Sequence, residues 1–370
     1  MKTYNWQQPD WPNFEYDLSG ILETLMVIAN KIGFISGQLN HLSEHLQTEA
    51  LIDLMVEEAI KTSQIEGERL NDADVRSSIK NKLGLNPKTV SVRDKRAQGI
   101  AELMLDVRKT FKQPLADETL FDWHLMVMSG TFNASLRVGC WRIDAEPMQV
   151  ISQHHGHLRV HFEAPPAKDV PKQMKEFIRW FNETAPGQSK AIAFAPVRAA
   201  LAHLYFESIH PFDDGNGRIG RAIAEKALSQ GTGYPIMMSL SHTIDADKKA
   251  YYDALKKASS SNEVTAWVNY FVNAILNAQD DAEEQINFVL KKSLFYQKFE
   301  KQLNERQLKI INRMLQAGIK GFEGGMTAKK YMKIADVSKA TATRDLQHLA
   351  DIDAFKQIGS GRSVHYGLNI

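Results

Sequence analysis

At 370 residues the chain is long enough to bury a sizeable core and to form two or three domains. Its 45 lysines and arginines nearly balance 44 acidic residues, and a net charge of +1 gives the whole molecule no field that would favour nucleic acid or an anionic membrane. The single cysteine, Cys140, excludes an intramolecular disulfide, and the sequence shows neither a signal peptide nor an apolar run of membrane-spanning length, which together predict a cytoplasmic protein with no membrane partner.

Residues 1–91 predict a helical N-terminal region. Apolar residues recur at helical spacing from Leu18 to Ile35, and further helices are expected from Thr48 to Ile65 and from Leu70 to Leu83. The second of these runs into Glu66, which stands just before a glycine that favours helix termination. The negative end of the helix dipole disfavours a carboxylate there, so Glu66 is either simply solvated or serves a purpose beyond its own helix.

Residues 92–278 predict a second domain, in which one hairpin interrupts a run of helices. Helices are expected at Arg93 to Arg108 and at Asp117 to Phe132. Met148 to Ser152 alternates as a strand does, and Leu158 to Phe162 returns as its partner. Four histidines lie in and near the turn between them. Because no cysteine or paired carboxylate completes a ligand set, we interpret these histidines as a polar hairpin tip and not as a metal site.

A twelve-residue stretch, His-Pro-Phe-Asp-Asp-Gly-Asn-Gly-Arg-Ile-Gly-Arg at 210–221, carries most of the chemistry. It follows a mostly apolar predicted helix, Ala191 to Ile209, and leads into a second helix, Arg218 to Gln230, which Gly231 is expected to close. The small residues at its centre allow backbone N–H groups to converge at a helix N-terminus. Such a cluster of donors, assisted by the helix dipole, is an anion site suited to phosphate.

Each polar side chain of the stretch has a chemical use. Arg218 and Arg221 leave one helix face, where both guanidinium groups can bind phosphate oxygens. Asp214 offers an oxygen ligand for Mg²⁺, and His210 supplies the imidazole that suits a general base near neutral pH. A plain turn between helices is a poor explanation, because it needs none of these residues. A calcium-binding loop is excluded because glycines stand where its ligands should be, and a P-loop is excluded because its sequence does not occur. The stretch therefore predicts phosphoryl or nucleotidyl transfer.

The stretch resembles the signature of the Fic family, His-Pro-Phe-x-Asp/Glu-Gly-Asn-Gly-Arg-x-x-Arg, at every specified position. The resemblance implies a mainly α fold, in which a Fic helical core carries a β-hairpin flap. It also implies a Mg²⁺-dependent protein adenylyltransferase, a nucleotidyltransferase that moves AMP from ATP to a serine, threonine or tyrosine hydroxyl of a target protein. In such an enzyme His210 would be the catalytic base and Asp214 the metal ligand. The phosphates would be held by Gly215, Asn216, Gly217, Arg218 and Arg221.

The resemblance extends to the end of the second predicted helix. Many Fic proteins carry an inhibitory motif, Ser/Thr-x-x-x-Glu-Gly/Asn, whose specified positions are matched here by Thr62, Glu66 and Gly67. In those proteins the glutamate pairs with the second arginine of the signature, which is Arg221 in this chain, and obstructs a productive γ-phosphate. The resemblance thus implies that Glu66 inhibits its own enzyme.

Two further parts of the predicted core acquire expected roles in the same way. The flap would align the target segment by pairing with it as an added strand. The flap residues expected nearest to nucleotide and target are Val150, Ile151, Ser152 and Gln153. Tyr251 and Tyr252 would lie beside the adenosine, with ordinary core packing as the alternative for either one.

A helical connector, residues 279–300, is expected to lead to a separate unit, residues 301–370. There three helices, the third capped by Ser338, precede two short strands, Phe355 to Ile358 and Val364 to Leu368, which is the order of a winged helix. Candidates for contact with a DNA major groove are Lys339, Thr341, Thr343 and Arg344. Their charge is diluted by nearby aspartates, namely Asp345, Asp351 and Asp353. DNA binding and protein docking both stay open for this winged-helix domain.

Two alternatives to AMP transfer also stay open. Some relatives of the resembled family move UMP, phosphate or phosphocholine, or remove AMP. A DNA-binding regulator, in which the Fic core only senses nucleotide, is the alternative from another class. Salt-dependent binding of duplex DNA by residues 301–370 would favour the regulator, and loss of target modification on changing His210 would favour the enzyme. The target could include the protein itself, and a homodimer is compatible with the sequence.

Overall fold

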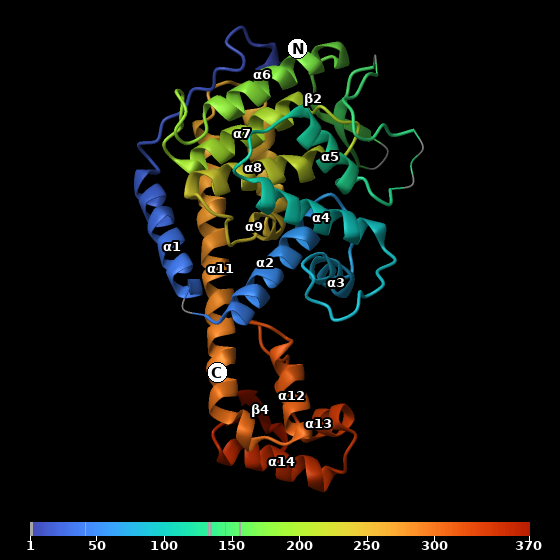
Figure 1. Ribbon diagram of the computed structural model, residues 1–370, viewed down its shortest axis with the longest axis vertical. Coiled ribbons are helices and arrows are strands. Elements are labelled where there is room, and N and C mark those ends of the chain that lie inside the picture. Colours follow the sequence, from blue (N-terminus) through green and yellow to red (C-terminus); the bar gives the residue numbers. More distant parts are fainter. Residues whose placement is uncertain (1–2, 41, 132, 134, 145, 155–156) are drawn as a thin grey trace. The chain divides into compact units, whose positions relative to one another are not determined.

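The computed structural model describes residues 3–40, 42–131, 133, 135–144, 146–154 and 157–370 (Figure 1). These residues form a mainly α-helical structure with two small sheets of two strands each. The chain divides into two compact units, one made of Met1–Gly37 and Leu51–Ala282 and the other of Gln38–Ala50 and Glu283–Ile370. None of the helices within the described ranges is long and apolar enough to cross a bilayer.

Three helices open the chain: α1, Leu22–Asn40; α2, Glu44–Ile65; and α3, Asp72–Lys82. The expected end of α2 at Ile65 is confirmed, and Gly67 follows with a φ of 84° that a glycine adopts without strain. The start of α2 was placed too late, because the helix begins at Glu44 and not at Thr48. The residues after Ile65 leave the helix where the twelve-residue stretch at 210–221, called the catalytic stretch from here on, comes close to them.

Helices α7, Ala195–Ile209, and α8, Asn216–Thr232, form the centre of the first unit. Every residue of α7 from Pro196 to Ile209 is buried. A helix that is buried on all sides needs no amphipathic stripe, and this explains its mostly apolar sequence. The same core includes residues of α4, Lys95–Thr110; α5, Asp117–Val127; α6, Val170–Glu183; α9, Leu240–Ala246; α10, Lys248–Ala258; and the part of α11, Thr265–Phe299, that ends at Ala282.

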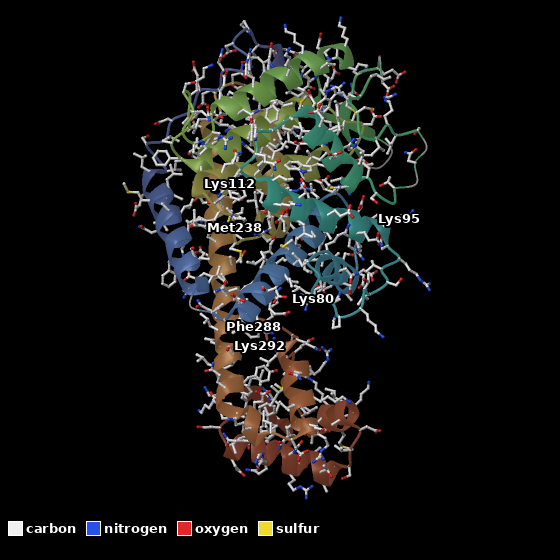
Figure 2. The ribbon with its side chains drawn as sticks, in the orientation of Figure 1. Lys80, Lys95, Lys112, Met238, Phe288 and Lys292 are labelled. Carbon is white, nitrogen blue, oxygen red and sulfur yellow. The ribbon has the colours of Figure 1, made fainter. Side chains whose placement is uncertain are left out.

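The core of the first unit is continuous across these helices. Trp267 of α11 is almost fully buried and donates its indole N–H to the carbonyl of Ala200, 2.8 Å away. Among the side chains drawn in Figure 2, Met238 is buried, whereas Lys95 and Lys112 are exposed. The core therefore holds α7 and α8 firmly, and with them the loop between these helices.

Gly231 does not close α8, contrary to the prediction. The helix continues to Thr232, and Gly233, with a φ of 82°, caps it by donating its N–H to Ser229 at 3.0 Å. Gly231 serves packing instead, because a Cβ atom there would lie only 2.2 Å from the Cβ of Ala195 in α7. The missing side chain lets the two central helices approach closely.

Gly231→Ala is therefore expected to lower the free energy of unfolding by about 1–3 kcal/mol, the usual cost of overpacking. Urea denaturation of the purified variant measures the change. Gly33→Ala is the matched control, since Gly33 lies in α1 and a Cβ there meets nothing within 4 Å. That control should be neutral or slightly stabilising. Equal stability of the two variants would contradict the packing role of Gly231.

The expected hairpin is present as β1, Gln149–His154, paired antiparallel with β2, His157–Glu163. A register shift between Val150 and Ile151 bends the ladder. The two turn residues, 155 and 156, lie outside the described residues. Since this sheet has two strands, each strand keeps one edge without a ladder partner in the part of the chain that the structure describes.

The second unit contains the predicted elements in the predicted order. The helices α12, Glu305–Leu315, α13, Ala328–Ala335, and α14, Lys339–Asp351, precede the antiparallel strands β3, Phe355–Ile358, and β4, His365–Leu368. Ser338 caps α14, as expected, by accepting a hydrogen bond from the N–H of Thr341. A separate core fills this unit, and its buried members include Ile310, Tyr331, Leu346 and Phe355.

Candidate active site

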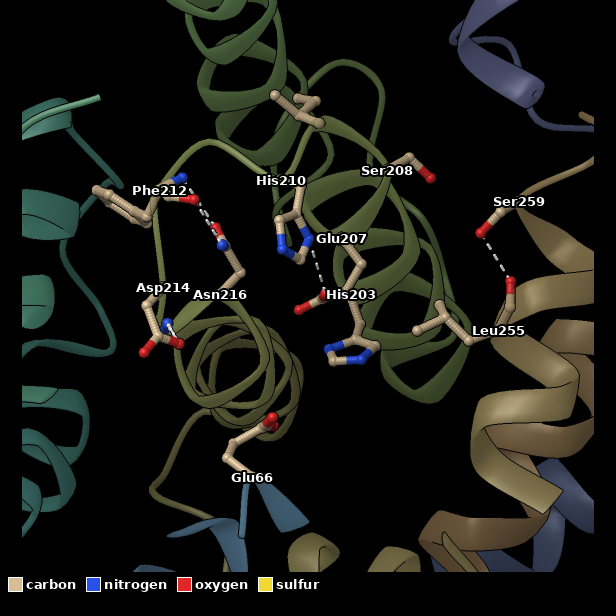
Figure 3. A network of polar contacts seen from close by, with 12 residues as sticks. Glu66, His203, Glu207, Ser208, His210, Phe212, Asp214, Asn216, Leu255 and Ser259 are labelled. Carbon is tan, nitrogen blue, oxygen red and sulfur yellow. Dashed lines mark hydrogen bonds and ion pairs between the residues drawn. The ribbon is translucent and has the colours of Figure 1, made fainter. Parts of the chain in front are cut away.

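The loop between α7 and α8 is held in one shape by its own residues. His210 ends α7 in the left-handed conformation, with a φ of 50°, and donates its N–H to Phe206 at 2.9 Å. The side chain of Asn216 then spans the loop, accepting from the N–H of Phe212 at 3.0 Å and donating to its carbonyl at 2.9 Å (Figure 3). Asn216 therefore shapes the loop with its amide, while the backbone N–H groups of the first turn of α8 lack intrahelical acceptors and suit an anion.

The two aspartates of the loop have different surroundings. Asp213 is bound by Arg137, whose backbone N–H and guanidinium lie 3.1 and 3.2 Å from its carboxylate oxygens. Asp214 is exposed, and one of its oxygens accepts from the N–H of Gly215 at 2.6 Å. The described residues contain no group of three or more possible metal ligands. A single exposed carboxylate fits Mg²⁺, which keeps several waters and shares substrate phosphates.

His210 has a carboxylate beside it that the sequence reading missed. Nδ1 of His210 lies 3.6 Å from Oε2 of Glu207, at ion-pair distance but longer than a hydrogen bond (Figure 3). Burial alone would raise the pKa of Glu207, but the nearby His210, His203 and Arg221 lower that pKa overall. Glu207 is therefore a carboxylate at neutral pH. Its contact is with Nδ1, which leaves Nε2 of His210 to accept a proton.

A buried polar pair, His203 and Tyr251, lies beside Glu207 and His210. His203 is buried, and its Nε2 lies 2.8 Å from the hydroxyl of Tyr251, which is itself 1% exposed. A Cβ on Gly220 of α8 would come within 2.5 Å of Oε1 of Glu207 and 3.1 Å of the His203 ring, so Gly220 gives these side chains room. His203, Glu207 and His210 follow an i, i+4, i+7 pattern on one face of α7. That pattern of polar residues in an apolar helix was the available signal.

The two predicted adenosine residues face different environments. Tyr251 is buried in the core, where its hydroxyl contacts His203. Tyr252, whose ring centroid lies 5.0 Å from that of Tyr251, is 42% exposed. Of the two tyrosines, Tyr252 is the one open to a ligand.

Glu66 lies against Arg221, as the resemblance implied. Nη2 of Arg221 is 2.7 Å from Oε1 of Glu66, and the same guanidinium donates to the carbonyl of Thr62 at 2.9 Å and, through Nε, to its hydroxyl at 2.8 Å. The side chain of Arg221 is 1% exposed. Burial would lower the pKa of Arg221, but the charge of Glu66 raises it overall, so the guanidinium keeps its charge.

The carboxylate of Glu66 also reaches the first turn of α8. A Cβ built on Gly217 would lie 2.2 Å from Oε1 of Glu66, so a side chain at this position would displace the carboxylate from where it lies. The negative charge thus stands at a helix N-terminus, where a phosphate would be favoured. Figure 3 shows Glu66 directed toward this end of the helix.

A second carboxylate of the same segment holds the other arginine. Oε1 of Glu68 lies 2.9 Å from Nη1 of Arg218, whose side chain is 3% exposed. The sequence reading did not identify Glu68, because its partner is far away in the chain and no local pattern marks it. Both arginines of the catalytic stretch are therefore already paired with carboxylates that follow α2.

The flap residues are described only in part. Val150 is partly exposed, while the side chains of Ile151, Ser152 and Gln153 lie outside what the structure describes. Their backbones belong to β1, where they pair with Val160, Arg159 and Leu158 in that order. Among the described residues one edge of β1 has no ladder partner, which is consistent with an added strand from a target.

Comparisons with known proteins agree with this geometry. A model described as "Fic/DOC family" matches residues 114–228, and one described as "Domain of unknown function (DUF4172)" matches residues 4–85. A Fido domain-containing protein of Dictyostelium discoideum is 34% identical over 110 residues, which cover 30% of this chain and 71% of that protein. The "Protein adenylyltransferase Fic" of Nematostella vectensis is 31% identical over 116 residues, or 31% of this chain and 25% of that protein.

A solved structure extends the likeness over nearly the whole chain. The crystal structure of a Fic family protein from Desulfovibrio desulfuricans G20 has a TM-score of 0.54 and 20% identity, covering 96% of this chain and 98% of that one. At this identity the likeness establishes a shared fold. The match to the Nematostella adenylyltransferase spans only about a quarter of that protein's length.

Proposed function

The chain belongs to the Fic/DOC family, and from this premise we propose that it is a protein adenylyltransferase. It moves AMP from ATP to a serine, threonine or tyrosine hydroxyl of a target protein. The observation that carries the proposal is the set of groups around the first turn of α8: the imidazole of His210, the exposed carboxylate of Asp214 and two buried arginines. The single cysteine favours the cytoplasm as the place of the reaction.

The proposed reaction is an in-line displacement at the α-phosphorus of ATP. Nε2 of His210 takes the proton of the target hydroxyl as the hydroxyl oxygen bonds to the α-phosphorus. The bond from that phosphorus to the oxygen bridging the α- and β-phosphates breaks, and pyrophosphate leaves. Glu207 beside Nδ1 stabilises the imidazolium that forms, as a carboxylate does in hydrolase triads.

The phosphates of ATP would be held by the start of α8. The backbone N–H groups of Gly215, Asn216 and Gly217 offer donors, and Arg218 and Arg221 would grip the β- and γ-phosphates. Asp214 would hold Mg²⁺, which when bound neutralises charge on the phosphates and on the leaving pyrophosphate. Since Glu66 and Glu68 pair with both arginines, we assign the described arrangement to a restrained enzyme.

ATP labelled in different positions tests the transferred group. Incubated with the full-length Glu66→Gly variant and a cell lysate, ATP labelled at the α-phosphate should label protein beyond the level seen when His210→Ala is added, and ATP labelled at the γ-phosphate should give no such excess. An excess from the γ-phosphate alone would indicate phosphate transfer and refute the proposal. Competition by excess unlabelled UTP or CDP-choline would show whether the nucleotide preference includes the donors of UMP or phosphocholine.

Glu207→Gln should lower kcat about tenfold, a part of the usual 10²–10⁴-fold contribution of a general base. The amide keeps the size of the side chain but removes the charge that stabilises the imidazolium formed during the reaction. The measurement is kcat, beside a nucleotide-binding titration, in a Glu66→Gly background. Glu23→Gln, on the exposed face of α1, is the control. An unchanged kcat would show that Glu207 is structural only.

A further inference from the structure

We propose that the second unit binds duplex DNA, with α14 in the major groove. This binding is independent of the transfer reaction proposed above and concerns a different part of the chain. Four observations support it: the charge of residues 301–370, the tight turn between α13 and α14, the residues exposed on α14, and the burial of Asp345.

Charge is distributed unevenly along the sequence. Residues 301–370 contain 12 lysines and arginines against 6 aspartates and glutamates, a net charge of +6, while the remaining 300 residues carry −5. The near-neutral total therefore conceals a basic C-terminal stretch, residues 301–370, and a slightly acidic remainder of the chain. A basic module of this kind favours a polyanion as its partner.

The helices α13 and α14 follow one another across a tight turn, which is the order of a helix-turn-helix. Asp336 ends α13 in the left-handed conformation with a φ of 53°, and Ser338 caps α14 only two residues later. The β3–β4 hairpin follows directly, as in a winged helix. In this arrangement the second helix is the one that enters the major groove.

The exposed side of α14 presents side chains that suit DNA. Lys339, Thr343, Arg344 and Gln347 are all exposed on one side of α14, where they line a shallow surface groove. Lysine and arginine bind phosphates. Arginine can also bind guanine, and glutamine can bind adenine, each through two hydrogen bonds. These charged and amide groups are the kinds of side chain that contact phosphates and base edges in a duplex.

The aspartate expected to weaken this surface is turned away from it. Asp345 is 4% exposed, lies 3.2 Å from Nε of Arg306 and accepts a hydrogen bond from the hydroxyl of Tyr331 at 2.9 Å. It therefore anchors α14 to α12 and α13 and does not dilute the charge of the exposed face, which corrects the prediction for this residue. Asp351, at the far end of the groove, accepts from Gln347 at 2.9 Å.

The test uses the full-length protein and a fluorescently labelled duplex of random sequence. Fluorescence anisotropy should show binding that weakens as salt is raised, because bound counterions are released. The double variant Lys339→Ala/Arg344→Ala should weaken binding at least about tenfold and flatten the dependence on salt. Lys301→Ala/Lys309→Ala is the matched control, since it removes the same charge from exposed residues outside the groove. Thermal melting of both variants verifies that they are folded.

The outcomes separate the possible partners. Loss of binding in the α14 variant alone would support the proposal, and a sequence preference among selected duplexes would strengthen it. Equal loss in both double variants would reduce the effect to net charge and overturn the assignment to α14. Absence of duplex binding at low salt would overturn it as well. If the α14 variant then lost target modification, the face would be a protein-docking surface.

Discussion

Glu66→Gly is expected to raise AMP incorporation about tenfold to a hundredfold at equal ATP and Mg²⁺, with little change in affinity for ATP. In the described arrangement Glu66 pairs with Arg221 and fills the space beside Gly217. A γ-phosphate cannot take the same guanidinium while the carboxylate holds it. We expect ATP to bind with its α-phosphate turned from the line of attack, and in-line geometry accounts for much of the barrier reduction.

Three companion variants separate the contributions to this restraint. Glu66→Gln keeps the size and removes the charge, so it should release the enzyme in part. Glu68→Gln frees Arg218 and should add a further increase in the Glu66→Gly background. Arg221→Ala should not mimic either change, because it removes a phosphate ligand together with the partner of Glu66. If Glu66→Gly is no more active than the natural protein, the restraint does not exist.

His210→Ala in the Glu66→Gly background is expected to reduce transfer by about 10²–10⁴-fold, the scale of a general base. Binding of ATP should be nearly unchanged, because the phosphates are held by α8 and its arginines. Label transfer from ATP, measured beside a nucleotide titration, tests both parts. His45→Ala, exposed on α2, is a control for the loss of an imidazole elsewhere. Transfer that persists in His210→Ala would refute the assigned role.

The catalytic stretch could be predicted from sequence because its residues are neighbours in the chain. A left-handed residue at a helix end, a glycine at the next N-cap and an arginine pair in one turn are local features. The contact of Glu66 with Arg221 joins residues 155 positions apart, and only a family resemblance suggested it. Nothing local suggested Glu68, and its pairing with Arg218 became visible only in the folded chain.

Burial explains the other differences between sequence and structure. Tyr251 and Tyr252 are adjacent on one helix, and tertiary packing alone decides that the first is buried and the second exposed. Gly231 is a residue type that often ends a helix, yet here it allows close packing against Ala195. Asp345 is charged and would be expected at the surface, but it is buried by its ion pair with Arg306 and its hydrogen bond with Tyr331.

Mass spectrometry of lysate proteins, after incubation with the Glu66→Gly variant and ATP, tests the central claim most directly. AMP transfer predicts peptides that gain the mass of one AMP group on a serine, threonine or tyrosine, and the same peptides should stay unmodified when His210→Ala is added. The protein's own peptides are searched as well, since it is a candidate target. Peptides that gain only phosphate in a manner that depends on His210, or no nucleotide adduct at all, would contradict the assignment as a protein adenylyltransferase.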